Sequence, residues 1–267
     1  MKGERYRLDM STLDLIPYLL SDGGISPRGK ASWTIFFRNK DDALIGEFRK
    51  CLYSVSSQNG FLNASRDGTK LVRIHSKELG ERLFRYTAFR TSACDRYPPC
   101  KMLAGGRGSC LECRKVKCLG KLYPDCRIPE EIFSSKESTK RFLRVYFTCD
   151  GGLSLTLGKN KNGLFIVRRL FLSVGHPKLR KDLMKLLGML GFKPVYYSDQ
   201  IRIISRKEFS KFKDEIGFVE NSKVGGNSSR FCGLEKNRLL DIIIKSYENP
   251  SIMIKKLNVF PNEFKSD

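Results

Sequence analysis

Two stretches of the sequence decide the fold: Ser21-Asp22-Gly23-Gly24-Ile25-Ser26 and, 128 residues later, Cys149-Asp150-Gly151-Gly152-Leu153-Ser154. A second pair of similar segments, Arg73–Leu79 and Arg202–Glu208, recurs at an offset of 129. Two matched pairs with nearly equal offsets indicate an internal duplication, because unrelated similarities would not keep the same spacing. The sequence therefore predicts two halves that fold alike.

Both halves predict the same order of elements. Each starts with an apolar helical run, at 15–20 and 142–147, that ends on Asp-Gly-Gly, where glycine can take the left-handed conformation that closes a helix. An amphipathic helix, at 41–55 and 177–190, lies between two strand pairs, and a short helix closes each half. Strands are predicted at 25–30, 32–38, 71–74, 153–158, 164–173 and 201–204, and N-caps at Ser11, Ser76 and Ser205. The predicted fold class is α+β, with two tandem αββαββα repeats and antiparallel sheets.

This organisation divides the chain into four parts. The first repeat occupies residues 1–87 and the second 138–218. A cysteine-rich connection at 88–137 joins them, and an extension at 219–267 carries a further amphipathic helix at 234–247. Because both repeats lie in one chain, we expect a monomer with internal pseudo-twofold symmetry.

The charge of the chain predicts its class of partner. Fifty Lys and Arg against 28 Asp and Glu leave a net charge of +22, with a pI near 9.7. Such a surplus repels itself unless a polyanion binds, so nucleic acid is the expected partner. No apolar stretch approaches the ~20 residues that a membrane-spanning helix needs, and no signal peptide is evident. We therefore expect no membrane partner and a soluble cytoplasmic protein, and the scarcity of glutamine favours a thermophilic microbial host.

The repeated aspartate predicts a metal-dependent activity. If the two apolar helices pack side by side, Asp22 and Asp150 meet at the negative ends of both helices and repel each other. Divalent cations relieve this repulsion, and oxygen ligands suit Mg²⁺. Paired metal ions can activate water and stabilise the leaving oxygen of a phosphodiester. With the basic surface, this pattern predicts a Mg²⁺-dependent DNA endonuclease.

The chain resembles the LAGLIDADG homing endonucleases that carry two motifs in a single chain. The family signature falls on Leu15–Gly23 and Leu143–Gly151, and the Gly-Leu-Glu-Lys-Asn segment at 233–237 is also similar. The resemblance implies that both motif helices pack at the interface between the halves and that Asp22 and Asp150 bind the catalytic metal. It further implies sheets that form a saddle over the DNA major groove, with both strands cut across the minor groove.

Further site residues follow from the same resemblance. The main-chain carbonyls of Ser21 and Cys149 are expected to assist the two aspartates in metal binding. A basic residue near the start of each closing helix is expected to support the attacked phosphate, and Lys77 and Arg206 match these positions, with Asn39 or Lys40 nearby. Pro17 departs from the small residues that the family prefers at the helix contact, and it predicts a kink or a late helix start.

Basic and polar residues alternate along the predicted strands. With period-2 alternation and this net charge, contact with DNA is favoured over a merely solvated face. The basic candidates are Arg28, Lys30, Arg38, Arg66, Lys70, Arg73, Lys159, Lys161 and Arg168, and the candidates for contact with bases are Ser32, Thr34, Ser154, Thr156 and Tyr197.

The cysteine-rich connection admits two interpretations. Six cysteines lie between residues 94 and 126, and Cys110 and Cys113 have the spacing of a zinc knuckle, which Cys100 and Cys118 would complete. Disulfides are the alternative, and six cysteines allow 15 full pairings. The sequence does not choose between structural zinc and disulfides.

Three functions fit these patterns. The first is a site-specific double-strand DNA endonuclease of the homing type. The second is an RNA-binding helper of intron splicing (a maturase) on the same scaffold, which needs the basic surface but not the acidic pair. The third is a DNA-binding regulator that has lost cleavage. Retention of both Asp22 and Asp150 argues against pure binding, because an idle carboxylate pair only destabilises the fold.

Overall fold

The computed structural model describes residues 9–28, 32–84, 86, 89, 123, 126–197, 199–226 and 230–259. The first half comprises α1 (Met10–Leu20), β1 (Gly23–Arg28), β2 (Ser32–Asn39), α2 (Asp42–Ser56), β3 (Phe61–Ala64), β4 (Lys70–His75) and α3 (Lys77–Phe84).

The second half repeats this order. It comprises the 3₁₀ helix η1 (Glu130–Ser134), α5 (Lys136–Asp150), β5 (Gly151–Asn160), β6 (Gly163–Ser173), α6 (Pro177–Met189), β7 (Val195–Tyr197), β8 (Gln200–Ile203) and α7 (Arg206–Glu215). Two further helices follow, α8 (Lys236–Lys245) and α9 (Pro250–Val259). The predicted α+β class and the twofold αββαββα order are thus confirmed.

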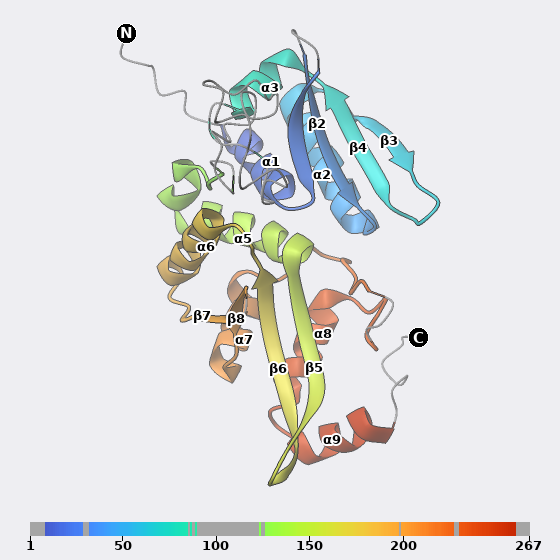
Figure 1. Cartoon of the computed structure of the whole chain (residues 1–267), viewed down its shortest axis with the longest axis vertical. Helices are drawn as coiled ribbons and strands as arrows, with labels where there is room; N and C mark the ends of the chain where they lie inside the picture. Colours follow the sequence, from blue (N-terminus) through green and yellow to red (C-terminus); the bar gives the residue numbers. More distant parts are fainter. Residues whose placement is uncertain are drawn as a thin grey trace, which may run out of the picture.

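Each half contains one antiparallel four-stranded sheet. The strand orders are β1-β2-β4-β3 and β5-β6-β8-β7, which are the same arrangement in both halves. The two hairpins differ in length, because β5 and β6 have 10 and 11 residues whereas β1 and β2 have 6 and 8. The β5–β6 hairpin therefore extends well beyond its sheet, and α9 lies against it (Figure 1).

One face of each sheet is covered and the other is open. In the first sheet the covered row contains Ile35, which pairs with Ile74, and both are buried. In the second sheet Leu170 pairs with Ile203, and both are again buried. Because side chains alternate across a strand, the residues between these positions lie on the open face.

The two halves meet through their first helices. α1 and α5 contact each other and lie between the two sheets (Figure 1). Both helices are largely apolar, and Leu15, Leu19, Leu143 and Phe147 on them are almost fully buried. Arg141 of α5 forms an ion pair with Asp14 of α1, and this contact also joins the halves. The interface is therefore an apolar helix pair with an ionic contact.

The start of α1 differs from the prediction. The helix begins at Met10, and the Asp9 carboxylate caps it by accepting a hydrogen bond from Thr12 N at 2.6 Å. Ser11 lies inside the first turn, so it does not form the predicted N-cap. Pro17 lies within the helix rather than delaying its start. The other two predicted caps are confirmed, since Leu79 N and Glu208 N donate to Ser76 and Ser205.

The glycines after each aspartate also serve a different purpose from the one predicted. Gly151 has φ −90° and ψ 156°, an extended conformation open to any residue. What demands glycine is space: a Cβ on Gly23 would lie 2.7 Å from the Tyr18 carbonyl oxygen, and one on Gly151 would lie 2.3 Å from that of Phe147. The helix thus folds directly onto the following strand, which fixes the aspartate between them.

The C-terminal helices cover the second hairpin. Arg168 of β6 donates from Nε to Ser246 Oγ at 2.7 Å, and its guanidinium lies 4.1 Å from the Tyr247 ring centroid. Leu257 of α9 is buried, and its carbonyl accepts a hydrogen bond from Arg230. Within the described ranges, no helix combines the length and apolar character needed to cross a membrane.

Candidate active site at the ends of the central helices

Asp22 follows Ser21, the C-cap of α1, and is held by the neighbouring strand. Its carbonyl accepts a hydrogen bond from Arg38 N at 3.1 Å, and its carboxylate accepts one from Asn39 Nδ2 at 2.7 Å. Burial raises the pKa of Asp22, while the Asn39 hydrogen bond and the charge of Lys236 act in the opposite direction. The carboxyl is therefore positioned by β2 but costly to ionise.

Asp150 is the last residue of α5 and lies close to Asp22. Burial raises the pKa of Asp150 to about 7, and the negative charge of Asp22 adds to this rise. A hydrogen bond from the Tyr146 hydroxyl and the charge of Lys236 oppose it. The repeat thus brings one carboxyl from each half together at the adjoining ends of α1 and α5, as the sequence predicts.

The helices meet just before these aspartates. The Ser21 hydroxyl donates to the Pro17 carbonyl at 2.8 Å and shares a hydrogen bond with the Cys149 side chain. Burial raises the pKa of the Cys149 thiol, and Asp22 and Asp150 raise it further, so the thiol stays protonated. Ser21 and Cys149 therefore lie beside the carboxylates, where their main-chain carbonyls are candidates for metal binding.

Lys236 supplies a positive charge to this centre, a role that was not predicted from the sequence. It is the first residue of α8, its backbone N–H donates to Ser222 O at 2.8 Å, and its Nζ donates to the Thr148 carbonyl at 2.5 Å. Burial lowers the pKa of Lys236, whereas Cys149, Asp41, Asp22 and Asp150 raise it. The ammonium group thus faces both catalytic candidates. Its only sequence signal was the Gly-Leu-Glu-Lys-Asn segment.

A cavity of about 1270 Å³ adjoins this centre. It lies between α1, α2, α5 and the segments at 218–225 and 232–236, and Asn39 and Lys236 are among the residues that line it. Asp41 ties two of its walls together, because its carboxylate caps α2 at Ala43 N and also accepts a hydrogen bond from Lys223 N at 2.7 Å.

The available ligands suit a hard divalent cation whose remaining ligands are supplied by water and a substrate. No cluster of three or more His, Cys, Asp and Glu side chains able to hold a metal occurs in the described part of the chain. Mg²⁺ does not need one, since it commonly binds through one or two carboxylates and completes its shell with water and substrate phosphates. Asp22 and Asp150, whose mutual repulsion Lys236 offsets only in part, meet this requirement.

The two basic residues expected near the carboxylates lie elsewhere. β4 starts beside Asn39 and ends beside Thr34, so Lys77, two residues further on, is at the far end of the sheet from Asp22. Arg206 follows β8 in the same way and forms an ion pair with Glu248 at 2.9 Å. The basic residue that the structure places beside both carboxylates is Lys236.

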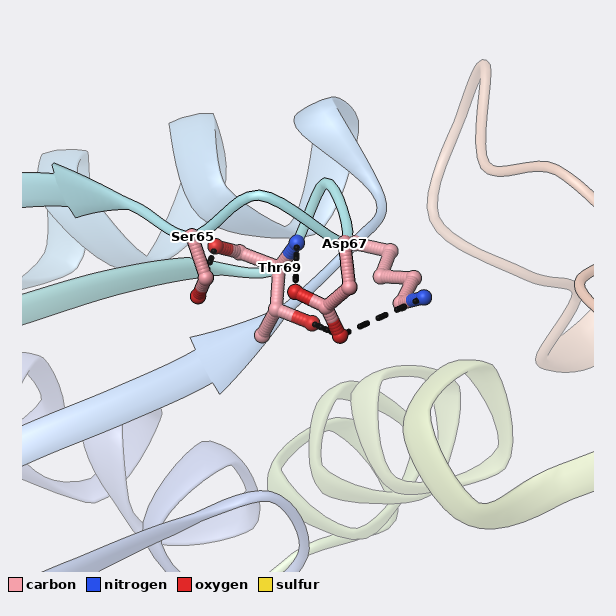
Figure 2. A network of polar contacts seen from close by, with 4 residues as sticks. Ser65, Asp67 and Thr69 are labelled. Carbon is pink, nitrogen blue, oxygen red and sulfur yellow. Dashed lines mark hydrogen bonds and ion pairs between the residues drawn. The ribbon is translucent and has the colours of Figure 1, made fainter.

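Lys40 forms an ion pair with an acidic residue of the β3–β4 turn. Figure 2 shows the β3–β4 turn, in which Asp67 accepts hydrogen bonds from Thr69 N at 3.1 Å and Thr69 Oγ1 at 2.7 Å. These bonds lower the pKa of Asp67 to about 2, and the ionised group pairs with Lys40 Nζ at 3.5 Å. Ser65 closes the turn by donating to the Thr69 carbonyl at 3.0 Å. Of the two neighbours suggested by the sequence, Asn39 bonds to Asp22, whereas Lys40 lines the adjoining cavity and pairs with Asp67.

Most of the described DNA-binding candidates lie on the open faces or in exposed turns. Those on the open rows are Ser32, Thr34, Arg38, Arg73, Ser154, Thr156 and Tyr197, and those in exposed turns are Arg66 and Lys161. Lys159 lies near the tip of the long hairpin. Its side chain belongs to the row that the helices cover further along the sheet, but it is itself exposed. The side chain of Arg28 and all of Lys30 lie outside the described residues.

Two candidates besides Lys159 lie on the covered rows, which differs from the prediction. Arg168 pairs with the fully buried Leu155 and therefore lies on the covered face, bonded to α8 and its C-terminal end. Lys70 lies on the covered row of the first sheet and forms an ion pair with Asp42. The open face instead presents Arg202, which stacks on Tyr197 at 4.6 Å and which the sequence analysis missed.

Seven of the nine cysteines fall into two groups. The proposed zinc or disulfide residues Cys100, Cys110, Cys113 and Cys118 lie outside the described residues. Cys51, Cys149 and Cys232 are only partly buried, and all three line the cavity.

Comparison with solved structures identifies the fold. The chain matches the LAGLIDADG meganuclease I-AabMI bound to uncleaved DNA, with a TM-score of 0.55 and 12% identity, over 96% of this chain and 99% of the other. It also matches the I-SmaMI LAGLIDADG homing endonuclease bound to cleaved DNA, with a TM-score of 0.54 and 13% identity, over 98% of this chain and 96% of the other. For I-SmaMI bound to uncleaved DNA target in the presence of calcium ions, the TM-score is 0.53 and the identity 11%, over 98% of this chain and 100% of the other.

At these identities the likeness concerns the fold alone. No protein-family model matches the chain, and no curated protein sequence is significantly similar to it. The chain therefore has the fold of the LAGLIDADG homing endonucleases over nearly its whole length, as the sequence resemblance implied.

Proposed function

We propose that this protein is a site-specific endonuclease that cuts both strands of double-stranded DNA by divalent-metal-dependent hydrolysis. The observation that carries the proposal is the meeting of Asp22 and Asp150 at the ends of the central helices. Their mutual repulsion is costly in a protein that only binds, and Lys236 offsets it only in part. A cation and a phosphate would complete this arrangement of charges.

The residues of the chain have distinct roles in this proposal. Asp22 and Asp150 hold the metal, Mg²⁺ in our proposal, with the carbonyls of Ser21 and Cys149 as further ligands. The bound ion supplies Lewis-acid chemistry, which lowers the pKa of water and neutralises charge on the leaving oxygen. Lys236 adds a positive charge beside the attacked phosphate, in the role first expected of Lys77 and Arg206.

Two side chains orient the carboxylates. Asn39 donates to Asp22, and Tyr146 donates to Asp150, so each acidic group is fixed in direction before substrate binds. Fixed polar groups need no reorganisation during the reaction, which is the main source of electrostatic catalysis. When DNA binds, its phosphate then meets carboxylates that are already oriented.

The open faces of the two sheets are the proposed DNA-binding surface. Arg38 and Arg73 are exposed on the first sheet, and Thr156 and Tyr197 on the second. The net charge of +22 supplies the sequence-independent attraction to phosphates. One monomer then spans the target, with the repeats proposed at 1–87 and 138–218 each contacting one half of it.

The first test is cleavage of a plasmid library that carries randomised targets. We expect linear product at one recovered site with Mg²⁺ and none with EDTA. Asp22→Asn and Asp150→Asn should each abolish cutting, because each removes a charge that holds the metal. Asp241→Asn is the control, since Asp241 forms a surface ion pair with Lys213 on α7.

The other outcomes separate the alternative functions. Tight, salt-sensitive binding to one DNA site without cutting, in the presence of Mg²⁺, would contradict the catalytic proposal and indicate a regulator. Neither cutting nor specific DNA binding, with binding to intron RNA instead, would indicate the splicing helper. An unaltered rate in Asp22→Asn would contradict the assignment of that ligand even if the protein cuts DNA.

A further inference from the structure

The segment that follows the second repeat returns to the first half of the chain. Lys223 N donates to Asp41 Oδ2 at 2.7 Å, a contact between residues 182 positions apart. Asp41 is the N-cap of α2, and its other carboxylate oxygen accepts a hydrogen bond from Ala43 N at 2.9 Å. Both oxygens of this side chain are thus bonded to main-chain N–H groups, one in its own helix and one in the distant segment.

This contact leads directly to the start of α8. Lys223 forms an antiparallel bridge with Glu235, the residue before Lys236. Lys236 N in turn donates to the carbonyl of Ser222, the residue before Lys223, at 2.8 Å. Because the two short segments are joined in this way, the bond between Asp41 and Lys223 also determines where the main chain of Lys236 lies.

The main chain of Asp41 serves the other side of the proposed centre. Asp41 N donates to Asn39 Oδ1 at 2.8 Å, and Asn39 Nδ2 donates to Asp22 at 2.7 Å. The start of α2 is therefore attached both to a carboxylate from the first half and to the segment that carries Lys236. Two groups from opposite ends of the sequence share this one attachment.

The side chain of Lys236 needs such an attachment because it is long and flexible. Its four-carbon stem can place the ammonium group in many positions. Nζ is held at one end by the Thr148 carbonyl of α5, at 2.5 Å, so the main chain has to be held at the other. A charge that is fixed before the substrate binds contributes more to catalysis than one that must be reoriented.

We propose that Asp41 is a positioning residue for cleavage: it fastens the segment at 219–236 to the first half and thereby holds Lys236 beside Asp22 and Asp150. Asp41 acts through Lys236 and touches neither the metal nor the DNA. This inference rests on the proposed function. A misplacement of about 1 Å costs up to about 100-fold in rate. Since the bond to Thr148 remains, we expect a loss of about 10-fold when the attachment is removed.

The test is single-turnover cleavage of the recovered target by Asp41→Asn, with Mg²⁺ and saturating protein. Asparagine caps a helix as well as aspartate does, so α2 keeps its N-cap, but the Lys223 N–H loses its acceptor. The rate constant should fall about 10-fold. The Kd for DNA should not rise, because removal of a negative charge does not weaken attraction to phosphates. Partial unfolding would lower the amplitude and leave the rate constant unchanged.

A second substitution shows whether Asp41 acts through Lys236. Lys236→Met alone should slow cleavage about 100-fold. Asp41→Asn in that background should cause no further loss, because the group that it positions is gone. Two independent effects would instead multiply to about 1,000-fold.

Two variants serve as controls. Asp182 on α6 also accepts a main-chain N–H from a distant segment, that of Ile128 at 3.1 Å. Asp182→Asn removes the same kind of bond by the same change, so it should cut at the wild-type rate even if both variants lose stability. Lys223→Met keeps the main-chain N–H that Asp41 binds, and it should also cut at the wild-type rate.

Hydrogen exchange tests the attachment without cleavage. The amides at 219–226 should exchange faster in Asp41→Asn than in the wild type or in Asp182→Asn. Unchanged exchange, an unchanged rate constant in Asp41→Asn, or a double variant about 1,000-fold slower than the wild type would overturn the inference. Failure of the proposed function gives a different result, since the wild type then cuts no target with Mg²⁺. In that case the inference fails with it.

Discussion

Replacing Gly151 by alanine tests whether the close contact between helix and strand fixes Asp150. The added Cβ would lie 2.3 Å from the Phe147 carbonyl oxygen and 3.0 Å from its carbonyl carbon and Cα. All three are backbone atoms of the last turn of α5, and that oxygen accepts the Gly151 N–H. Because the φ of −90° suits alanine, overlap is the only penalty of this substitution.

The size of the effect follows from this overlap. The Cβ–oxygen distance must open from 2.3 Å to at least 3.0 Å, and only backbone can move. Overpacking against a rigid neighbour costs about 3 kcal/mol, the upper end of the usual range. For a chain of this size each kcal/mol corresponds to about 2–4 °C, so Tm should fall by about 6–12 °C. Displacement of Asp150 should also slow cleavage about 100-fold.

Thermal unfolding of Gly151→Ala beside Gly188→Ala provides the measurement. Gly188 is exposed within α6, and a Cβ there meets no atom within 4 Å. Alanine in a helix interior is favoured over glycine by about 1 kcal/mol, so this variant should be more stable than the wild type. The same chemical change thus has opposite signs at the two positions. If Gly151→Ala unfolded at the wild-type temperature, the steric reason for the Asp-Gly pair that both halves repeat would be refuted.

Three other predictions concern charged groups. Arg168→Ala should lower Tm without altering the salt dependence of DNA binding, whereas Arg73→Ala should reduce the salt slope by about one and leave Tm unchanged. Without divalent ions, Asp150→Asn should stabilise the protein at pH 8 by up to about 4 kcal/mol and have little effect at pH 4. The reason is that the folded pKa of about 7 exceeds the usual 3.8, so ionisation costs stability as pH rises between these values. Thermal unfolding in EDTA measures this difference. Lys236→Met should slow cleavage about 100-fold at saturating DNA, with Lys223→Met as the unaffected control, in single-turnover assays.

The duplicated framework was predictable because its signals are local. The periodicity of apolar residues gave α2 and α6 to within one or two residues at each end, and the hairpin strands followed from alternation. The two Asp-Gly-Gly stretches located the acidic pair, since equal positions in two packed repeats meet at the pseudo-twofold axis. The reason for the glycines was not predictable, because the overlapping atoms belong to the preceding helix and are known only from the packing.

The face of each strand was the less predictable feature. Alternation separates two rows of side chains, but it does not say which row the helices cover. An error of one position moves every side chain of the strand to the opposite face. Arg168 belongs to the covered row because α8 and its C-terminal end reach that part of β6, a contact between distant segments. Long, charged side chains can lie on a covered face when polar groups of a neighbouring element receive them, as Ser246 does here.

The central site is also less symmetric than the repeat that builds it. Asn39 comes only from the first half, and Lys236 comes only from the segment that follows the second half. A dimer of first halves would contain two oriented aspartates without the lysine, and a dimer of second halves would have Val174 at the hairpin position that Asn39 holds in the first half. The first half thus supplies the amide, and the segment after the second half supplies one ammonium that faces both carboxylates and offsets part of their charge. Fusion of the repeats into one chain allows this division, because only then can a single side chain serve both aspartates.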